Sequence, residues 1–386
     1  MTPRSSAASL DDVRRHNLGR IVEIVHHSGA ISRSQLTRAT GLNRSTISAL
    51  VGELVAAGLV SEADPTGDRR VGRPSPVVSA GASAVAFAVH AELDSITVGL
   101  VQLGGVVIAK LRVDVDQVPT AESAVEVAAA LIERLSHEHG VERSAGVGVA
   151  VPGLVRDGDG VVRLAPHLLW RDAPIERMLS RATNLPVSVA NDATLGARAE
   201  RTFGAGRGVD DLVYLNGGAS GIGGGIVLGG RTLTGLSGYA GEFGHAFSTD
   251  AGAALEDLVD RASLTAALGV AAPTDAELET ALAASNDAEV AQLVARQATT
   301  LGRGLAGTIN ILNPAAVILG GFLGVIFDCA PEHLLAAVRE HTLAPAFDDV
   351  SVARAQLGDN LLMIGAGELA FDRCISNPLG ALRAQK

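Results

Sequence analysis

The chain has 386 residues and a formal net charge of −11, and 47% of its residues are hydrophobic but only 3% aromatic. This length allows two or three domains with sizeable cores, and the aliphatic composition is typical of α/β packing. The two cysteines, Cys329 and Cys374, lie outside any C-x-x-C pattern, so they support neither a disulfide framework nor a cysteine zinc site. We read both as small core residues.

No segment has the features of a membrane anchor or a secretory signal. The most apolar run, residues 315–330, contains paired glycines and an aspartate and is shorter than the ~20 residues of a spanning helix. The first nine residues lead into charged Asp11 and Asp12 rather than into an apolar core. We therefore expect a cytoplasmic protein with no membrane partner.

Charge is divided unevenly along the chain. Residues 1–77 hold ten arginines against seven acidic residues, a net charge of +3, so the remainder has 21 basic and 35 acidic side chains and a net charge of −14. A basic N-terminal part on an acidic body predicts a nucleic-acid contact at one end of the molecule. We predict two domains, a head of residues 1–78 and a body of residues 79–386.

Helical patterns follow one another through the head. Apolar residues recur at helical spacing over 13–27. Ser32 and Gln35 have the spacing of a capping box, which predicts a second helix that ends at Gly41. Asn43 is a good N-cap for a third helix. This order is that of a helix-turn-helix.

The start of the third helix is polar and suited to a DNA groove. Two short strands, 59–60 and 76–78, flank an arginine-containing loop, so we predict a winged helix-turn-helix. The alternative for the head is an ordinary three-helix bundle with a polar face. In the loop, Gly72-Arg73-Pro74 fits equally well an arm that enters the minor groove or a simple turn. The residues predicted to contact DNA are Arg33, Asn43, Arg44, Ser45, Thr46, Ser48, Arg70 and Arg73.

Small residues at 79–83 predict a flexible linker between head and body. Three strands, at 85–89, 96–103 and 106–113, follow, and an alanine-rich helix is expected over 121–137. Further on, a buried strand over 185–190 leads to Asn191 and Asp192. Residues 331–375 are expected to complete the last lobe of the body with two helices around one strand.

The stretch from Asn191 to Glu256 combines glycines with hydrogen-bonding side chains. Residues 216–225 contain six glycines, and such a density lets backbone N–H groups approach a ligand closely. The polar residues among and after the glycines are donors and acceptors suited to hydroxyl groups. We interpret the stretch as a sugar or polyol pocket, with tight turns in a glycine-rich sheet as the alternative.

Four motifs, three of them in or beside this stretch and the fourth at residues 312–324, resemble the ROK family of sugar kinases and sugar-responsive repressors: VANDATLGARAE, GASGIGGGIVLGGRTLTG, GEFGH and LNPAAVILGGFLG. The likeness covers about residues 81–375 and is strongest toward the xylose- and N-acetylglucosamine-responsive repressors. It implies an α/β actin-like body of two lobes, with Asp192 at the position of the kinase base. It also implies sugar contacts from Gly153, His167, Asn191, Asp192, Glu242, His245 and Glu256.

The sequence departs from the family pattern at three places. The kinase phosphate motif D-x-G-x-T is matched by His90, Glu92 and Asp94, and two carboxylates there would repel ATP. No cysteine lies between His245 and Glu256, whereas family members hold a structural zinc there. His167 stands where many relatives have asparagine, and it is either a sugar donor or a surface histidine. We therefore expect no kinase activity, no ATP and no zinc or other metal.

Together these patterns predict a DNA-binding repressor of carbohydrate genes that responds to a sugar. A homodimer or homotetramer would bind a double-stranded operator with inverted-repeat symmetry. The sugar would close the two lobes, and the head would sense the closure through the linker at 79–83 and through the dimer contact. The alternative is a cytoplasmic ATP-dependent sugar kinase with an appended DNA-binding domain. A purely structural dimer module would not explain the clustered hydroxyl-binding residues.

Overall fold

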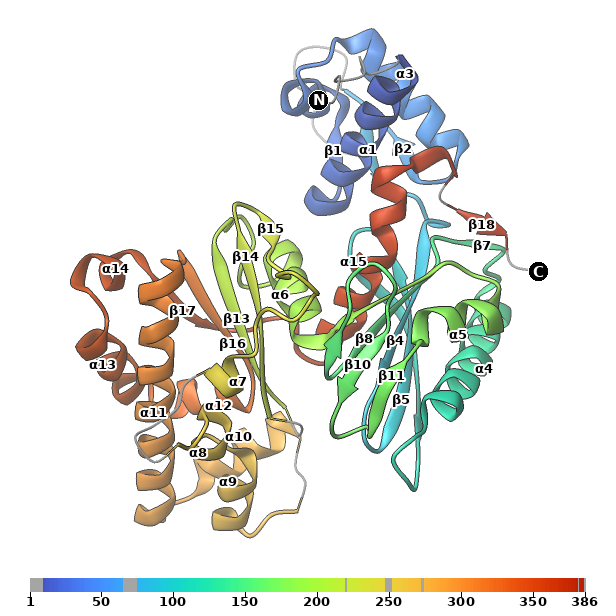
Figure 1. Cartoon of the computed structure of the whole chain (residues 1–386). Coiled ribbons are helices and arrows are strands. Elements are labelled where there is room, and N and C mark those ends of the chain that lie inside the picture. Colours follow the sequence, from blue (N-terminus) through green and yellow to red (C-terminus); the bar gives the residue numbers. More distant parts are fainter. Residues whose placement is uncertain are drawn as a thin grey trace, which may run out of the picture.

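The computed structural model describes residues 10–64, 75–218, 221–246, 252–271, 274–380 and 382–384. Figure 1 shows three parts, in which the head lies above the first of two lobes and the second lobe lies beside it. The predicted combination of a winged helix-turn-helix and a two-lobed α/β body is confirmed.

The head is built as its capping signals predict. Ser32 accepts the backbone N–H of Gln35, whose side chain in turn accepts the N–H of Ser32 at 2.9 Å. Gly41 ends the second helix at φ 72°, and Asn43 accepts the N–H of Thr46 at 2.8 Å. The elements are α1 (Leu10–Ser28), β1 (Ile31–Ser32), α2 (Arg33–Thr40), α3 (Arg44–Ala56), β2 (Val60–Ala63) and β3 (Val77–Ala80), with the strands ordered β1-β3-β2.

The segment predicted as a flexible linker is held on both sides. The boundary expected after residue 78 falls inside β3, which continues to Ala80. Gly81 donates its N–H to the carbonyl of Leu59 at 2.9 Å, and its own carbonyl accepts Gln102 Nε2 at 3.1 Å. The small residues here thus permit close backbone packing between head and body, and the flexibility of the segment stays a prediction.

The first lobe contains a five-stranded sheet in the order β12-β8-β4-β5-β6. The meander β4-β5-β6 is antiparallel, whereas β8 and β12 run parallel to β4. The predicted strands and helix of this meander are confirmed with bounds within a few residues. Its elements are β4 (Val85–Ala91), β5 (Ser95–Gln102), β6 (Val106–Asp114), α4 (Ala121–His139), β8 (Val147–Val151), α5 (Ile175–Thr183), β12 (Val187–Asn191) and α15 (Leu361–Ser376).

The second lobe repeats the same strand order, β15-β14-β13-β16-β17. Its first three strands are antiparallel and its last two parallel, so the two sheets have one topology. The elements are β13 (Leu212–Gly218), β14 (Gly221–Leu228), β15 (Arg231–Thr232), α7 (Phe243–Ala246), α8 (Leu255–Leu258), α9 (Arg261–Leu268), α10 (Asp275–Ala284), α11 (Ala288–Leu312), β16 (Ala316–Gly321), α12 (Phe322–Cys329), α13 (Pro331–His341), α14 (Ala344–Asp349) and β17 (Ser351–Arg354).

Short elements complete the fold. A small antiparallel sheet has the order β11-β10-β9, and β18 pairs with β7. The bounds are β7 (Arg143–Ser144), β9 (Leu154–Val155), β10 (Val162–Ala165), β11 (Trp170–Ala173), η1 (Gly358–Asn360), η2 (Pro378–Gly380) and β18 (Arg383–Ala384).

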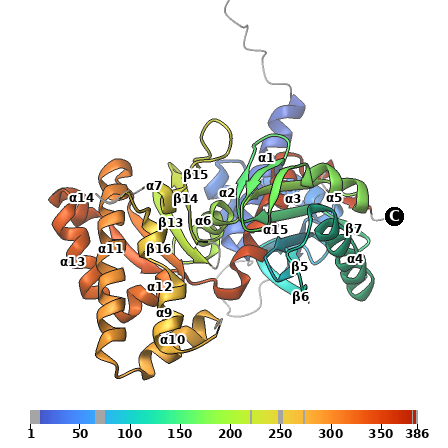
Figure 2. The same cartoon turned by 60° about the horizontal axis from the view of Figure 1, so that its bottom comes forward.

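Helix α6 (Asp192–Phe203) lies between the lobes in both views (Figures 1 and 2). The chain passes from the first lobe to the second after α6, and it returns before α15. Glu200, which is fully buried, accepts backbone N–H groups at both crossings: Ala205 at 2.7 Å, and Gln356 and Leu357 at 2.9 Å each. This side chain therefore ties the two crossings together at the end of α6.

The last long helix, α15, does not complete the second lobe as predicted. It packs on β4 and β8 of the first lobe and then continues up to the head, where its end lies against α1 (Figure 1). A Cβ on Gly148 of β8 would lie 1.8 Å from the carbonyl oxygen of Ala366, so α15 and the sheet meet backbone to backbone. Cys374 of this helix is buried as expected, but Cys329 is exposed, which corrects its assignment to the core.

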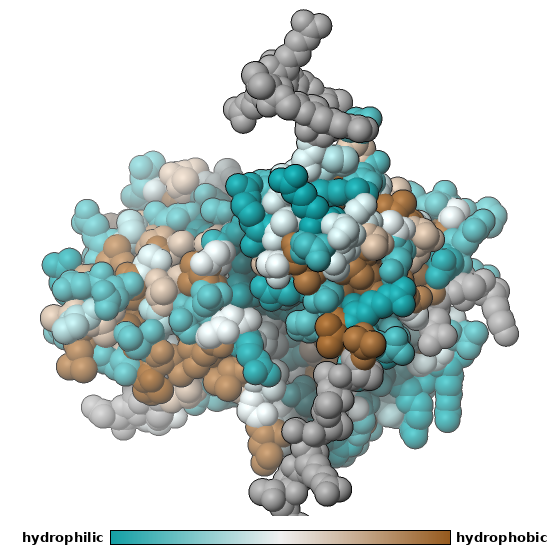
Figure 3. All heavy atoms as spheres, turned by 90° about the horizontal axis from the view of Figure 1, so that it is seen from above, coloured by the Kyte–Doolittle hydropathy of each residue, from teal (hydrophilic) through white to brown (hydrophobic). Residues whose placement is uncertain are grey.

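Seen from the side of the head, polar side chains cover most of the surface and apolar ones form scattered patches (Figure 3). None of the helices in the described part of the chain has the length and hydropathy to cross a membrane.

Candidate functional site

The first wall of the candidate sugar site is formed where two parallel strands end. β12 pairs with β8 so that Asn191 lies opposite Val151, and Gly153 follows two residues later. Asn191 donates its Nδ2 to the carbonyl of Gly153 at 3.1 Å, and its Oδ1 accepts the N–H of Thr194 at 2.9 Å as the N-cap of α6. Asn191 therefore fixes the loop after β8 against the start of α6 and retains one N–H for a ligand.

Asp192 occupies the first turn of α6 and has a strongly shifted acidity. Its Oδ1 accepts the N–H of Ala193 at 2.8 Å, which favours the charged form. Removal from water outweighs this contact, and the negative charges of Glu242 and Glu92 add to it, so the pKa of Asp192 is raised from 3.8 to about 7. A half-neutral carboxyl at neutral pH can both donate to and accept from a hydroxyl group.

The opposite wall comes from the second lobe. Glu256 accepts the N–H of Ile222 at 3.1 Å through one oxygen, and the other oxygen lies 3.4 Å from Nδ1 of the exposed His245. Burial raises the pKa of Glu242, His245 opposes this shift, and Glu256 adds to it. The negative charge of Glu242 contributes to the raised pKa of Asp192, so these two carboxyl groups, one from each wall, interact electrostatically.

The glycines of β14 serve a role that the sequence reading missed. A Cβ on Gly225 would lie 2.5 Å from the Cβ of Ala197, and one on Gly223 would lie 3.0 Å from the Cβ of Ala193. The close contact of these two glycines is thus with α6, and an approach of this backbone to a ligand stays a prediction. Gly221, at φ 113°, and Gly244 instead make room for Glu256, because a Cβ on either would lie 2.5 Å from its Oε2.

His167 is placed apart from these residues. It is exposed in the turn between β10 and β11 and makes no hydrogen bond or ion pair with the other candidate sugar residues. The other six predicted residues form two groups, Gly153, Asn191 and Asp192 after β8 and β12 of the first lobe, and Glu242, His245 and Glu256 beside the start of β14 in the second lobe. A sugar contact from any of the seven remains a prediction.

The hairpin that replaces the phosphate motif has a counter-ion that we did not foresee. Arg112 of β6 lies 3.4 Å from Glu92, 3.4 Å from Asp94 and 2.8 Å from Asp114. His90 is buried, and desolvation lowers its pKa although Glu92 opposes the shift. The positive charge of Arg112 partly neutralises these carboxylates, so they repel an incoming phosphate less than expected. Arg112 is itself engaged by the carboxylates and is not available to bind the phosphate. Arg112 of β6 pairs with Thr97 of β5 across the sheet. The register of the predicted strands could therefore have shown that this arginine lies beside the β4-β5 hairpin.

The family zinc does not fit the residues present. His245 is directed to Glu256, and residues 246–255 contain no sulfur ligand. One histidine leaves a tetrahedral structural site three ligands short. We expect packing, in place of a metal, to hold the loop after His245. Residues 247–251 of this loop lie outside the described residues, so this stays a prediction.

The predicted DNA-reading surface is exposed at the start of α3. Asn43 and Ser45 are exposed and hydrogen-bonded to each other at 2.7 Å, and Thr46 is half-buried. Arg44 is exposed and makes no hydrogen bond or ion pair with any described residue, which leaves its guanidinium available to a guanine or a phosphate.

Arg33 is engaged inside the head instead. It donates to Ser48 at 2.9 Å and pairs with Glu62 of β2, so it holds α2, α3 and the wing strand together. This pairing argues against Arg33 and Ser48 as free DNA contacts. Arg70 and Arg73 lie outside the described residues.

The comparisons with known proteins cover both parts of the chain. The family model described as "ROK family" matches residues 87–373, and the model described as "MarR family" matches residues 19–71. The xylose repressor of Caldicellulosiruptor bescii is 26% identical over 389 residues, which cover 93% of this chain and 96% of that protein. A glucokinase of Halalkalibacterium halodurans is 31% identical over 273 residues, covering 63% and 81% of the two chains.

A solved structure shares the whole architecture. The crystal structure of a ROK family transcriptional regulator, a homologue of the E. coli MLC protein, aligns with a TM-score of 0.76 and 24% identity over 95% of this chain and 98% of that one. The family match extends over most of the body, including both walls of the candidate site. The chain belongs to the ROK family.

Proposed function

We propose that this protein is a transcriptional repressor of carbohydrate genes that binds operator DNA through α3 and a sugar between the lobes. The observation that carries the proposal is the joining of a MarR-type winged helix to a ROK body in one chain, as in the xylose repressors that match over the same length. The exposed start of α3 and the facing carboxylates of Asp192 and Glu242 supply the two binding surfaces. Neither ATP nor zinc has a part in this function.

The sugar response tests the proposal directly. We expect D-xylose, D-glucose or N-acetylglucosamine to raise the thermal stability of the protein, because a ligand that binds only the folded state stabilises it. The same sugar should change the operator Kd by about 5- to 150-fold, which corresponds to a coupling of about 1–3 kcal/mol. Asp192→Asn and Glu242→Gln should abolish this change and leave operator binding without sugar intact. A normal sugar response in both variants would place the effector site elsewhere.

Arg44 tests the DNA surface. We expect Arg44→Ala to weaken operator binding by about 1–3 kcal/mol, because its guanidinium is free to bind a guanine edge. Fluorescence anisotropy on an inverted-repeat operator selected from random DNA measures the effect. Arg303→Ala is the matched control, since Arg303 is also exposed but lies on α11 of the second lobe. Equal affinities for the two variants would remove Arg44 from the reading surface.

A sugar kinase is the second candidate, and one observation favours it. A pKa of about 7 suits Asp192 to act as a general base at neutral pH. Against it, Glu92 and Asp94 hold Arg112 at the hairpin where the kinases of this family bind phosphate.

We expect no sugar-dependent ATP turnover above background. The assay is ADP release with the same three sugars, and Asp192→Asn serves as the blank. A sugar phosphate that forms with the parent protein and not with this variant would establish the kinase.

A further inference from the structure

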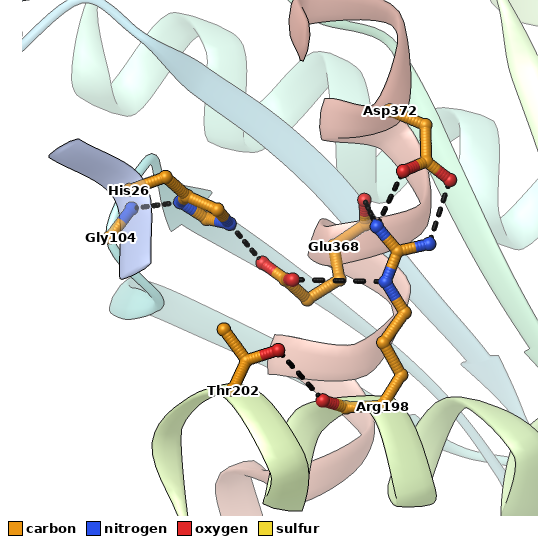
Figure 4. A network of polar contacts seen from close by, with 6 residues as sticks. All are labelled: His26, Gly104, Arg198, Thr202, Glu368 and Asp372. Carbon is orange, nitrogen blue, oxygen red and sulfur yellow. Dashed lines mark hydrogen bonds and ion pairs between the residues drawn. The ribbon is translucent and has the colours of Figure 1, made fainter. Parts of the chain in front are cut away.

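A buried polar network joins the DNA-binding head to the body (Figure 4). His26 lies at the end of α1, and its side chain is fully buried against Glu368 of α15. Arg198 of α6 lies 3.7 Å from the second oxygen of Glu368 and binds both oxygens of Asp372, at 2.5 and 2.7 Å. Three helices, from the head, the first lobe and the lobe junction, therefore meet at one carboxylate.

Both ring nitrogens of His26 have a partner in this network. The backbone N–H of Gly104 donates to Nδ1 of His26 at 2.7 Å, so Nδ1 carries a lone pair and the proton lies on Nε2, which donates to Glu368. Burial opposes ionisation of Glu368, but His26 and Arg198 together lower its pKa below the ordinary value. The connection thus runs from the imidazole of His26 through a carboxylate to a guanidinium.

His26, His27 and Glu368 also have ligand atoms within 4.8 Å of one another, which raises the question of a metal ion. Both ring nitrogens of His26 already have protein partners, and the charge of Arg198 stands beside Glu368. We therefore interpret the cluster as an ion-pair network and not as a cation site.

Helix α6 connects the candidate sugar site with this network. Its first turn carries Asp192, and Arg198 lies nearly two turns further along. At its end, the ring of Phe203 meets that of His26 edge to face, with centroids 5.3 Å apart. Just beyond, Arg207 donates to the carbonyl of His27 at 3.1 Å. One helix of 12 residues, about 18 Å long, thus spans from the sugar site to the end of α1.

Both lobes contact α6 closely. Gly225 of the second lobe allows the contact with Ala197 on one side. On the other side, a Cβ on Gly365 of α15 would lie 2.6 Å from the carbonyl oxygen of Leu195. A change in the angle between the lobes must therefore shift α6 against at least one of these neighbours. Because separating a buried ion pair is costly, Glu368 and His26 would follow Arg198.

We propose that α6 transmits occupancy of the sugar site to the DNA-binding head through the chain Arg198–Glu368–His26. This proposal rests on the proposed function, since it names the route of the same sugar response. It replaces the route through residues 79–83, which are fixed to the body by Gln102 and carry no contact to the sugar site. In this proposal Glu368 positions the DNA-binding head through its contact with His26.

The test compares two glutamates that each pair with an arginine, Glu368 in the buried network and Glu279 at a more exposed position. Glu368→Gln keeps an acceptor for His26 but removes the charge that attracts Arg198. Glu279→Gln is the control, because Arg354 binds Glu279 and Asp328 in the second lobe as Arg198 binds Glu368 and Asp372. The measurement is the operator Kd with and without the sugar, among D-xylose, D-glucose and N-acetylglucosamine, that gives the largest thermal shift.

We expect the ratio of the two operator Kd values to fall at least threefold in Glu368→Gln and to stay unchanged in Glu279→Gln. Linkage requires the same fall in the effect of operator DNA on the sugar Kd, which a general loss of stability would not produce. Gln102→Ala, which frees the segment at 79–83, should leave the ratio unchanged. A full sugar response in Glu368→Gln, or a response lost in Gln102→Ala alone, would overturn the proposal.

A second readout needs no sugar. Amide hydrogen exchange in the last turns of α1 should accelerate at least tenfold in Glu368→Gln and not in Glu279→Gln, because the head is then held less firmly. If the parent protein shows no sugar response while α1 exchange still accelerates, the proposed function fails although the network holds the head. If the parent responds and Glu368→Gln responds equally, the route is wrong and the function stands.

Discussion

Glu200→Gln is expected to lower the free energy of unfolding by about 3 kcal/mol, although the two side chains have the same size and shape. Glu200 is fully buried, and its oxygens accept three backbone N–H groups from the two crossings between the lobes. Glutamine replaces one oxygen by an amino group, so at least one N–H would face another donor. A buried hydrogen bond to a charged group contributes about 1.5–3 kcal/mol, and an unsatisfied donor adds to the loss.

Urea denaturation of the two proteins at pH 7 measures this difference. Glu133→Gln is the control, because Glu133 is exposed on α4 and its replacement should change stability by no more than about 0.5 kcal/mol. A loss below about 1 kcal/mol in Glu200→Gln would show that the crossings are held by packing and not by this carboxylate.

Asp192→Asn is expected to stabilise the protein at alkaline pH and to have no effect at acid pH. The folded pKa of about 7 lies above the ordinary 3.8, so between these values the folded state binds more protons than the unfolded chain. Stability of the parent protein therefore falls as the pH rises through this window, and the penalty is complete above pH 7. Asparagine carries no such penalty.

The full shift corresponds to about 4 kcal/mol, but Asp192 is only half-buried and water relaxes around its charge, so we expect roughly 2 kcal/mol at pH 8. The free energies of unfolding of both proteins are to be compared at pH 4 and pH 8. A difference that is the same at both values would mean that Asp192 titrates as an ordinary aspartate.

Local signals in the sequence predicted the local structure well. The helix caps of the head depend only on residues within four positions of one another. They are the pair Ser32 and Gln35, Gly41 and Asn43, and their effect can be predicted without knowledge of the rest of the fold. The strand meander of the first lobe was predicted for the same reason, because alternation and turn residues lie within it. The family motifs added the sugar residues, which no spacing argument could have brought together across 65 residues.

Long-range contacts account for what the sequence did not reveal. The partners of Glu368 lie at positions 26 and 198, and those of Glu200 at positions 356 and 357, and no periodicity connects such distant residues. The contact of the β14 glycines with α6 was not foreseen because the sequence does not show that α6 crosses them. The ion pair of Arg33 was not foreseen because its partner, Glu62, belongs to a strand whose position depends on the whole head.

The core of the head has a consequence for chimaeric repressors. Leu18, Ile21 and Val25 of α1 share one continuous apolar core with Phe371 and Cys374 of α15. A Cβ on Gly19 would lie 2.1 Å from the carbonyl oxygen of Ile375, so this interface tolerates no added side chain. A hybrid made by joining the head of one relative to the body of another after β3 would therefore carry only the α1 side of the α1–α15 interface from the first protein. A working hybrid has to exchange the last three turns of α15 together with the N-terminal segment, although nearly 300 residues separate them in the gene.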